Sequence, residues 1–199
     1  MNKNTDSASE PKHSILVQLL EDYQNKRYDS AEKTALLITE EFPDHPFAWK
    51  LLGALLNQTG RVSEALSACQ KSVLLDKNNA EANNNLGHTL YKLDRLEEAE
   101  SSYRKSIEID PNNALAHYNL GQTLEKRGDL EQSEISYKEA IALRPNYIEA
   151  YNNLGIVLKS LGKLEEVEKV SRHEINLDKD SKKNLMKLTL HQFFRILSL

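Results

Sequence analysis

Apolar residues recur three or four positions apart over most of the chain, a spacing that places them on one face of an α-helix. In the middle of the sequence this pattern predicts a helix at about Ala80–Leu93 and a second at about Leu96–Ile109. A tight turn near Asp94 joins them. Asp110-Pro111-Asn112-Asn113 then predicts a stop, because proline cannot continue a helix and Asn and Asp favour turns. The chain is therefore expected to be all-α and built from short antiparallel helix pairs.

The same pattern returns every 34 residues. When Asn83–Asn113 is laid over His117–Tyr147, the two segments agree in polar as well as apolar positions. A fixed period of this length is the signature of a stacked array of helix pairs. The matching positions are Asn85/Asn119, Leu86/Leu120, Gly87/Gly121, Leu90/Leu124, Tyr103/Tyr137, Ile107/Ile141 and Pro111/Pro145.

The 7 glycines follow the period as well, so none remains for a phosphate-binding loop. A glycine inside a helix costs about 1 kcal/mol relative to alanine. We therefore expect the first group to mark places where the paired helix approaches closely, with Ala99 and Ala140 opposite. The second group, seven residues later, marks the turn between paired helices. The first group is Gly53, Gly87, Gly121 and Gly155, and the second is Gly60, Gly128 and Gly162.

With these positions the chain resembles the tetratricopeptide repeats, whose pattern places aromatic, Leu-Gly, Ala and Pro residues at set offsets. Trp49, Leu52-Gly53 and Ala65 carry the resemblance in one unit, and Tyr151 and Leu154-Gly155 carry it in another. The resemblance implies a right-handed superhelical solenoid of antiparallel helix pairs. It covers about Lys12 to Ser181 as five repeats, at 12–45, 46–79, 80–113, 114–147 and 148–181.

The two ends of the chain depart from the repeat. Residues 1–11 are polar and without apolar periodicity, which predicts a disordered tail. Lys182–Leu199 is mostly apolar after a basic start, whereas the end of a solenoid normally has a polar outer face. Three interpretations stay open for this segment: a helix capping the last repeat, a surface for a partner or for self-association, and a truncated sixth repeat.

Composition narrows the class of partner. Charged residues make up 28% and the formal net charge is −4, which argues against general nucleic-acid binding because that requires a basic surface. Ser14–Leu20 is too short an apolar run to span a membrane and has no cleavage site after it, so a cytoplasmic protein without a membrane segment is expected. One cysteine, Cys69, excludes a disulfide framework. It stands in the register of Tyr103, which favours a buried packing role.

No arrangement of residues typical of catalysis is found. The six histidines are scattered, and none forms the close pair with which a helix binds zinc. The adjacent carboxylates Glu40-Glu41, Glu97-Glu98 and Glu165-Glu166 fall in helix-surface contexts. We therefore expect no enzyme activity, no metal and no cofactor.

Amides gather instead on the face that the resemblance assigns to the concave groove. Asn85, Asn119 and Asn153 share one register, and neighbouring registers of the same helical face add polar side chains. Asparagine is a poor helix former, and two in a row break a local rule, which tends to mark a site. The candidate peptide-binding groove therefore consists of Lys50, Asn84, Asn85, His88, Tyr118, Asn119, Gln122, Asn152 and Asn153.

Similar asparagine ladders occur in the superhelical repeats of O-linked N-acetylglucosamine transferases, where they hold extended peptide backbones. The resemblance assigns that role to Asn85, Asn119 and Asn153, and Leu51 breaks the ladder in the second repeat. The alternative is that these amides bond to neighbouring helices or to water. A carboxylate clamp is not favoured: Lys50 and Asn85 fit it, but Ala54, Leu115 and Asn119 stand where Asn, Lys and Arg are required.

The sequence leaves two hypotheses about function, which belong to different classes of protein. The leading hypothesis is a non-catalytic interaction module or scaffold that holds an extended peptide or a partner helix in its groove. The second is an N-terminal targeting arm of a glycosyl-, sulfo- or methyltransferase whose catalytic domain lies outside this chain. The decayed fifth repeat, with Val167 and Ser171 in place of Ala and Tyr, motivates the second, and the gene sequence beyond residue 199 distinguishes the two.

Overall fold

The computed structural model describes residues 10–171, which fold into helices without strands. The helix pair predicted in the middle of the chain is confirmed. Its first helix ends one residue earlier than expected, and its second ends at the expected residue. A further helical stretch covers residues 164–171. The helices are α1 (His13–Gln24), α2 (Tyr28–Glu41), α3 (Pro46–Gln58), α4 (Val62–Leu75), α5 (Ala80–Lys92), α6 (Leu96–Ile109), α7 (Ala114–Arg127), α8 (Leu130–Leu143) and α9 (Ile148–Ser160).

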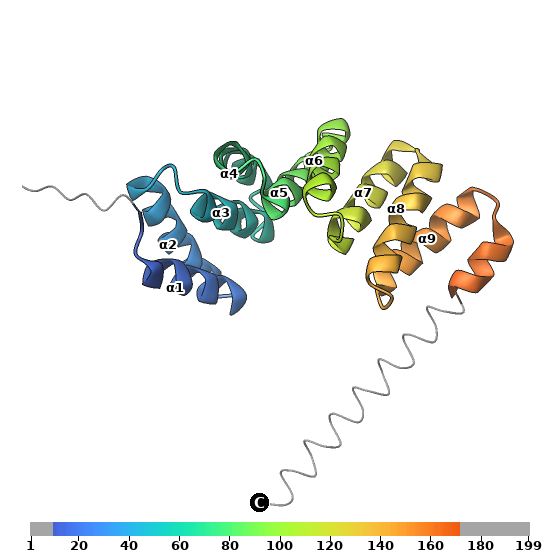
Figure 1. Cartoon of the computed structure of the whole chain (residues 1–199), viewed down its shortest axis with the longest axis horizontal. Helices are drawn as coiled ribbons and strands as arrows, with labels where there is room; N and C mark the ends of the chain where they lie inside the picture. Colours follow the sequence, from blue (N-terminus) through green and yellow to red (C-terminus); the bar gives the residue numbers. More distant parts are fainter. Residues whose placement is uncertain (1–9, 172–199) are drawn as a thin grey trace, which may run out of the picture. The chain divides into compact units, whose positions relative to one another are not determined.

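The chain divides between Pro111 and Asn112 into two compact units. Unit 1 contains α1–α6 and unit 2 contains α7–α9 with the stretch 164–171; in each, consecutive helices form antiparallel hairpins (Figure 1). Helices α3, α5, α7 and α9 begin 34 residues apart. The all-α fold of repeated helix pairs is therefore confirmed. The division into five repeats, and one solenoid across both units, stay predictions.

Two predictions fall at the ends of the chain. Of the tail expected to be disordered, residues 1–9 lie outside the described residues, whereas Pro11 is buried. The apolar segment Lys182–Leu199 also lies outside them, as does the end of the fifth repeat beyond residue 171. Self-association through Lys182–Leu199 stays a prediction.

The turn inside each hairpin has one backbone conformation. A residue with positive φ ends the turn: +81° at Gly60, +89° at Gly128 and +75° at Gly162. Non-glycine residues take the same place in two hairpins, with φ of 58° at Lys26 and 62° at Asp94. The prediction that Asp94 occupies the glycine position is confirmed. Glycine is favoured there because side chains rarely adopt this region.

Close approach of the paired helix explains three of the four glycines within the first helices, but the nearest atoms there do not belong to Ala99 or Ala140 as predicted. A Cβ added to Gly87 meets the ring of Tyr103 at 2.7 Å, and one added to Gly121 meets the ring of Tyr137 at 2.7 Å. At Gly53 the atom met is the sulfur of Cys69, which is buried as the register predicted. At Gly155 nothing described lies within 4 Å, and Ser171 stands in the tyrosine register.

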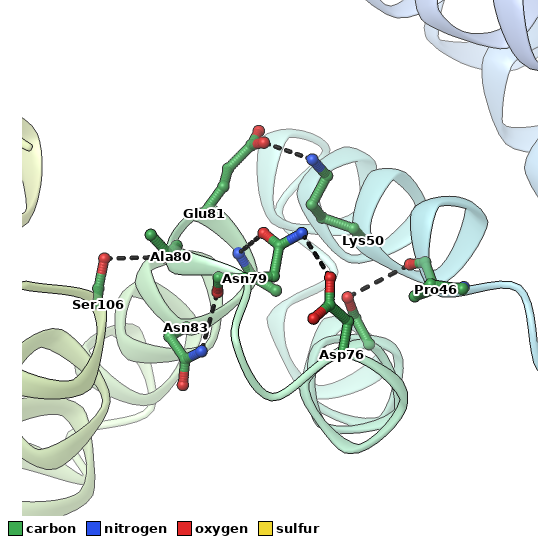
Figure 2. A network of polar contacts seen from close by, with 10 residues as sticks. Pro46, Lys50, Asp76, Asn79, Ala80, Glu81, Asn83 and Ser106 are labelled. Carbon is green, nitrogen blue, oxygen red and sulfur yellow. Dashed lines mark hydrogen bonds and ion pairs between the residues drawn. The ribbon is translucent and has the colours of Figure 1, made fainter. Parts of the chain in front are cut away.

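Polar contacts fix the start of α5 against its neighbours (Figure 2). The side-chain oxygen of Asn79 accepts a hydrogen bond from the backbone N–H of Ala82 at 3.0 Å, and its amide donates to Asp76 at 3.1 Å. Ser106 of α6 donates to the carbonyl of Ala80 at 2.8 Å. An N-cap of this kind satisfies a backbone donor that a helix start leaves unpaired. The loop Asp76–Asn79 thus orients α5, which carries three candidate groove residues.

Each unit has its own apolar core. In unit 1, leucines and alanines of α1–α4 form one cluster, with Leu19, Ala31 and Ala48 fully buried. In unit 2, Tyr137 packs with Leu154, Val157 and Leu158 of α9. Burial of such apolar surface is the main favourable term in folding. The small residues in these cores allow the helices to lie close together. The polar side chains of α3, α5, α7 and α9 lie at the surface or between helices.

Candidate binding surface

Lys50 on α3 is held by its neighbours rather than extended into solvent. Its ammonium group pairs with the carboxylate of Glu81 on α5, and it lies 5.4 Å from the centre of the Phe47 ring (Figure 2). The side chain of Lys50 is 13% exposed, whereas that of Glu81 is 63% exposed. The pair cancels the charge on this part of α3 and α5. It also occupies the lysine that a carboxylate clamp would need.

The α5 candidates of unit 1 differ in what they contact. Asn84 is buried and already has a partner. Asn85 is half-buried, and within residues 10–171 its side-chain amide has no hydrogen bond; its backbone carbonyl accepts one from the Thr89 hydroxyl at 2.8 Å. Burial and the charge of Lys92 lower the pKa of His88, so its imidazole is neutral near pH 7. Among the α5 candidates, Asn85 is thus the one whose amide a ligand can address.

In unit 2 the candidate side chains bond to one another. The amide of Asn153 donates to the hydroxyl of Tyr118 at 3.2 Å and to that of Tyr137 at 3.3 Å. Gln122 donates to the same Tyr118 hydroxyl at 3.1 Å, and Tyr137 donates to Glu125 at 2.7 Å. This chain of bonds joins α7, α8 and α9. It leaves the side-chain oxygen of Asn153 as the acceptor that a ligand can reach.

The other two amides of unit 2 lie at opposite extremes. Asn119 is 8% exposed and has a partner of its own. Asn152 is exposed and has a partner too. Ile156, one turn further along α9, is 55% exposed. The three asparagines of the predicted ladder therefore differ: Asn85 has an unbonded amide, Asn119 is buried, and Asn153 is largely bonded within the protein.

Aromatic rings support the unit 2 network. The ring of Tyr118 lies 4.8 Å from that of Tyr147 and 5.8 Å from that of Tyr137, measured between centres. The Arg144 guanidinium lies 4.5 Å above the Tyr147 ring, a cation–π contact. Burial, reinforced by the nearby Tyr118 hydroxyl, raises the pKa of Tyr147 to about 12. Burial also raises the pKa of Tyr137, so Tyr137 and Tyr147 are neutral at physiological pH.

Buried polar residues outside the predicted groove also join α3, α4 and α5. Asn57 of α3 donates to Thr89 of α5 at 2.7 Å, and Cys69 of α4 lies 3.4 Å from the same hydroxyl. The side-chain oxygen of Asn57 is buried without a hydrogen bond among the described residues. Lys92 donates to the Asn57 carbonyl at 3.3 Å. The signal in the sequence is that Asn57 stands in the register of Tyr91 and Glu125, both polar.

Metal and membrane sites find no support in the part of the chain that the structure describes. Among residues 10–171, no three His, Cys, Asp or Glu side chains converge as a metal site would require. None of the described helices is both long and apolar enough to cross a bilayer. The candidate surface consists instead of amides, hydroxyls and paired charges.

Comparison with known families decides the class. Models of the tetratricopeptide repeat match residues 16–82, 78–146 and 136–169, so that together they span most of the chain. The chain belongs to the tetratricopeptide repeat family. The resemblance inferred from the Leu-Gly, Ala and Pro positions is thereby confirmed. A specific similarity to the arms of O-linked N-acetylglucosamine transferases stays a prediction, and so does a catalytic domain beyond residue 199.

Solved tetratricopeptide structures share the fold. MamA superposes with a TM-score of 0.76 at 22% identity, covering 82% of this chain and 95% of that one. YrrB, described as a tetratricopeptide protein with an unusual peptide-binding site, gives a TM-score of 0.71 at 16% identity and covers 92% and 95%. Identities this low establish the fold alone. A search of the curated proteins gave no match.

Proposed function

We propose that this tetratricopeptide chain is a non-catalytic interaction module that holds an extended segment of a partner polypeptide against the first helices of its pairs. Asn85 carries the proposal. Its amide is half-buried on α5 and has no hydrogen bond within residues 10–171. Its side-chain atoms are not fully buried, so a ligand can replace water at this amide with hydrogen bonds of its own.

The chemistry around Asn85 suits a peptide backbone. A primary amide offers two donors and one acceptor, which match the C=O and N–H of an extended chain. Lys50 is neutralised by Glu81, and His88 is uncharged near pH 7, so the α3–α5 surface selects neither strongly acidic nor strongly basic segments. Main-chain contacts of this type give affinity, and adjacent pockets give selectivity.

Unit 2 supports the same function with fewer free groups. The amide hydrogens of Asn153 are engaged by Tyr118 and Tyr137, so this residue offers an acceptor. The exposed Asn152 and Ile156 flank it along α9. A partner segment could donate a hydrogen bond to the Asn153 side-chain oxygen and pack against Ile156. Asn119 is buried and would not contact the partner.

The structure favours a single substitution over removal of all three asparagines. Replacing Asn119 or Asn153 disturbs buried or bonded groups, whereas Asn85→Ala removes an unbonded amide and raises helix propensity. Peptides are first selected from a random library against the full chain. Their affinities are then measured by calorimetry for wild type, Asn85→Ala and the loop control Asn78→Ala.

We expect Asn85→Ala to lose about fivefold to thirtyfold in affinity, which corresponds to about 1–2 kcal/mol for hydrogen bonds to one amide. Asn78→Ala should bind as wild type does. Circular dichroism should show the same helical content in all three proteins. Equal affinity of wild type and Asn85→Ala for every selected peptide would remove Asn85 from the site and end the proposal.

A further inference from the structure

A hollow of about 400 Å³ opens in unit 1 between α4 and α6, over α5. Its apolar lining comes from Val73 and Leu74 of α4 and from Leu86 of α5. Lys77, in the loop before α5, and Lys105, on α6, also line it. The hollow is shallow and open to solvent, so it suits one large apolar side chain resting against its lining rather than an enclosed small molecule.

The hollow lies on a different face from Asn85. Successive residues of an α-helix turn by about 100°, so Leu86 and Asn83 point away from the side of α5 that carries Asn85 and His88. Asn83 contributes to the lining, but its amide is already bonded to the backbone oxygens of Asn79 at 2.9 Å and Lys77 at 3.4 Å. The hollow is therefore separate from the surface of the proposed function.

The apolar residue at its edge has no role in the core. Leu74 is 64% exposed, although it is the penultimate residue of α4 and its neighbour Ser72 is buried. In the same register the chain has Glu40, Glu108 and Ala142. Leucine at a position that elsewhere is polar or small costs solubility without adding buried contacts. Such a departure from the local rule tends to mark a site.

The lysine in the loop is a second departure at the same place. Lys77 replaces the proline that ends the other pairs, at Pro43, Pro111 and Pro145. It is exposed, and none of the described residues forms a salt bridge with it. Lys105 is paired with Glu108 at 2.8 Å, but both side chains are exposed, and such pairs contribute little and exchange partners readily. The two departures from the repeat, at Leu74 and Lys77, therefore place an apolar surface beside a positive charge.

We propose that this hollow is a second docking site, which takes an acidic segment of a partner protein in which a large apolar side chain is flanked by carboxylates. The apolar side chain enters between Val73, Leu74 and Leu86. The carboxylates pair with Lys77 and Lys105, one on each side. Charge complementarity of this kind sets partner choice and association rate, and the buried apolar side chain supplies most of the affinity.

The test uses a heptapeptide amide with the order Glu-Glu-Leu-Phe-Leu-Glu-Glu, labelled with fluorescein at its N-terminus, and fluorescence anisotropy with the full chain. Leu74→Glu restores the residue found in register at two other pairs. Leu37→Glu is the matched control, because Leu37 is 59% exposed on α2, away from the hollow. Lys77→Glu/Lys105→Glu tests the charges, and Lys33→Glu on α2 is its control.

We expect Leu74→Glu and the double lysine variant to weaken probe binding at least tenfold, with Leu37→Glu and Lys33→Glu unchanged. Asn85→Ala should also leave it unchanged, which separates this site from that of the proposed function. Rising salt should weaken binding, because exposed charges are screened. The proposal fails if wild type does not bind the probe, if Leu74→Glu binds equally well, or if a probe with lysine for glutamate competes as strongly. Displacement of the probe by decanoate at equal concentration would also overturn it in favour of a lipid site.

Discussion

The glycine at the middle of each first helix allows packing to be measured separately from helix propensity. Gly121→Ala and Gly155→Ala make the same chemical change at equivalent positions of α7 and α9. Each gains about 1 kcal/mol of helix propensity. They differ in surroundings: at Gly121 the new methyl carbon meets ring carbons of Tyr137 at 2.7 Å, and at Gly155 it meets no described atom within 4 Å.

The Tyr137 ring has little freedom to yield. Its side chain is completely buried, it lies against Tyr118, and its hydroxyl is bonded to Glu125 and Asn153. Overpacking of this kind costs about 1–3 kcal/mol. Because the propensity gain is common to both variants, this cost is also the expected difference in unfolding free energy between them. Gly155→Ala should lie about 1 kcal/mol above wild type, and Gly121→Ala at or below it.

Urea unfolding followed by helical ellipticity at 222 nm measures the difference. Repeat proteins can unfold in stages, so the midpoints of all phases are compared and the slope is checked for constancy. A thermal scan should separate the two variants by several degrees. Equal midpoints, or a less stable Gly155→Ala, would refute the reasoning that the aromatic ring at this register is what requires glycine.

Three further outcomes follow from the contacts. Tyr137→Phe should lower stability by about 1–2 kcal/mol in urea unfolding, because its hydroxyl links Glu125 to Asn153, and an unchanged midpoint would contradict this. Hydrogen bonds from Ser30, Arg27 and Gln18 hold the pKa of the buried Asp22 carboxyl below its usual range. The contribution of Asp22 to the free energy of unfolding is therefore present above the unfolded pKa, near 3.9, and is lost as pH falls through the folded pKa. Asp22→Asn should flatten the acid side of the curve of stability against pH, and an unchanged acid side would contradict this. Burial raises the pKa of the Cys69 thiol, so Ellman's reagent should modify it slowly in the native protein and rapidly in urea, whereas equal rates would show that it is accessible.

The helices and their close contacts could be predicted because they depend on periodicity. Pro111 ends one pair through backbone geometry and Asn113 caps the next helix with its side chain, and the glycine register predicts a close approach at Gly87 without naming Tyr103 as the residue approached. Neither feature depends on the angle at which helices cross. This is why the predicted and observed ends of α5 and α6 agree so closely.

The state of the asparagines could not be predicted in this way. Asn85, Asn119 and Asn153 are equivalent in register, yet their bonding depends on whether a hydroxyl from another helix lies within about 3 Å, and that varies with crossing angle and with local side chains. Asn153 finds Tyr118 and Tyr137, whereas Asn85 finds no such hydroxyl within residues 10–171. The hollow at Leu74 could not be predicted for another reason: its signal is a departure from the repeat at Leu74 and Lys77, whereas the 34-residue period is recognised from positions that agree.

The shared backbone of the hairpin turns has a consequence for the length of such a chain. The bend at Gly60, Asp94 and Gly128 has one conformation, and each pair begins at a fixed offset from the last. Duplication or loss of one 34-residue stretch in the gene would therefore leave the turn inside every remaining pair unchanged. Recombination can change the number of pairs in whole steps, and what remains to be matched in each case is the set of side chains where neighbouring pairs meet.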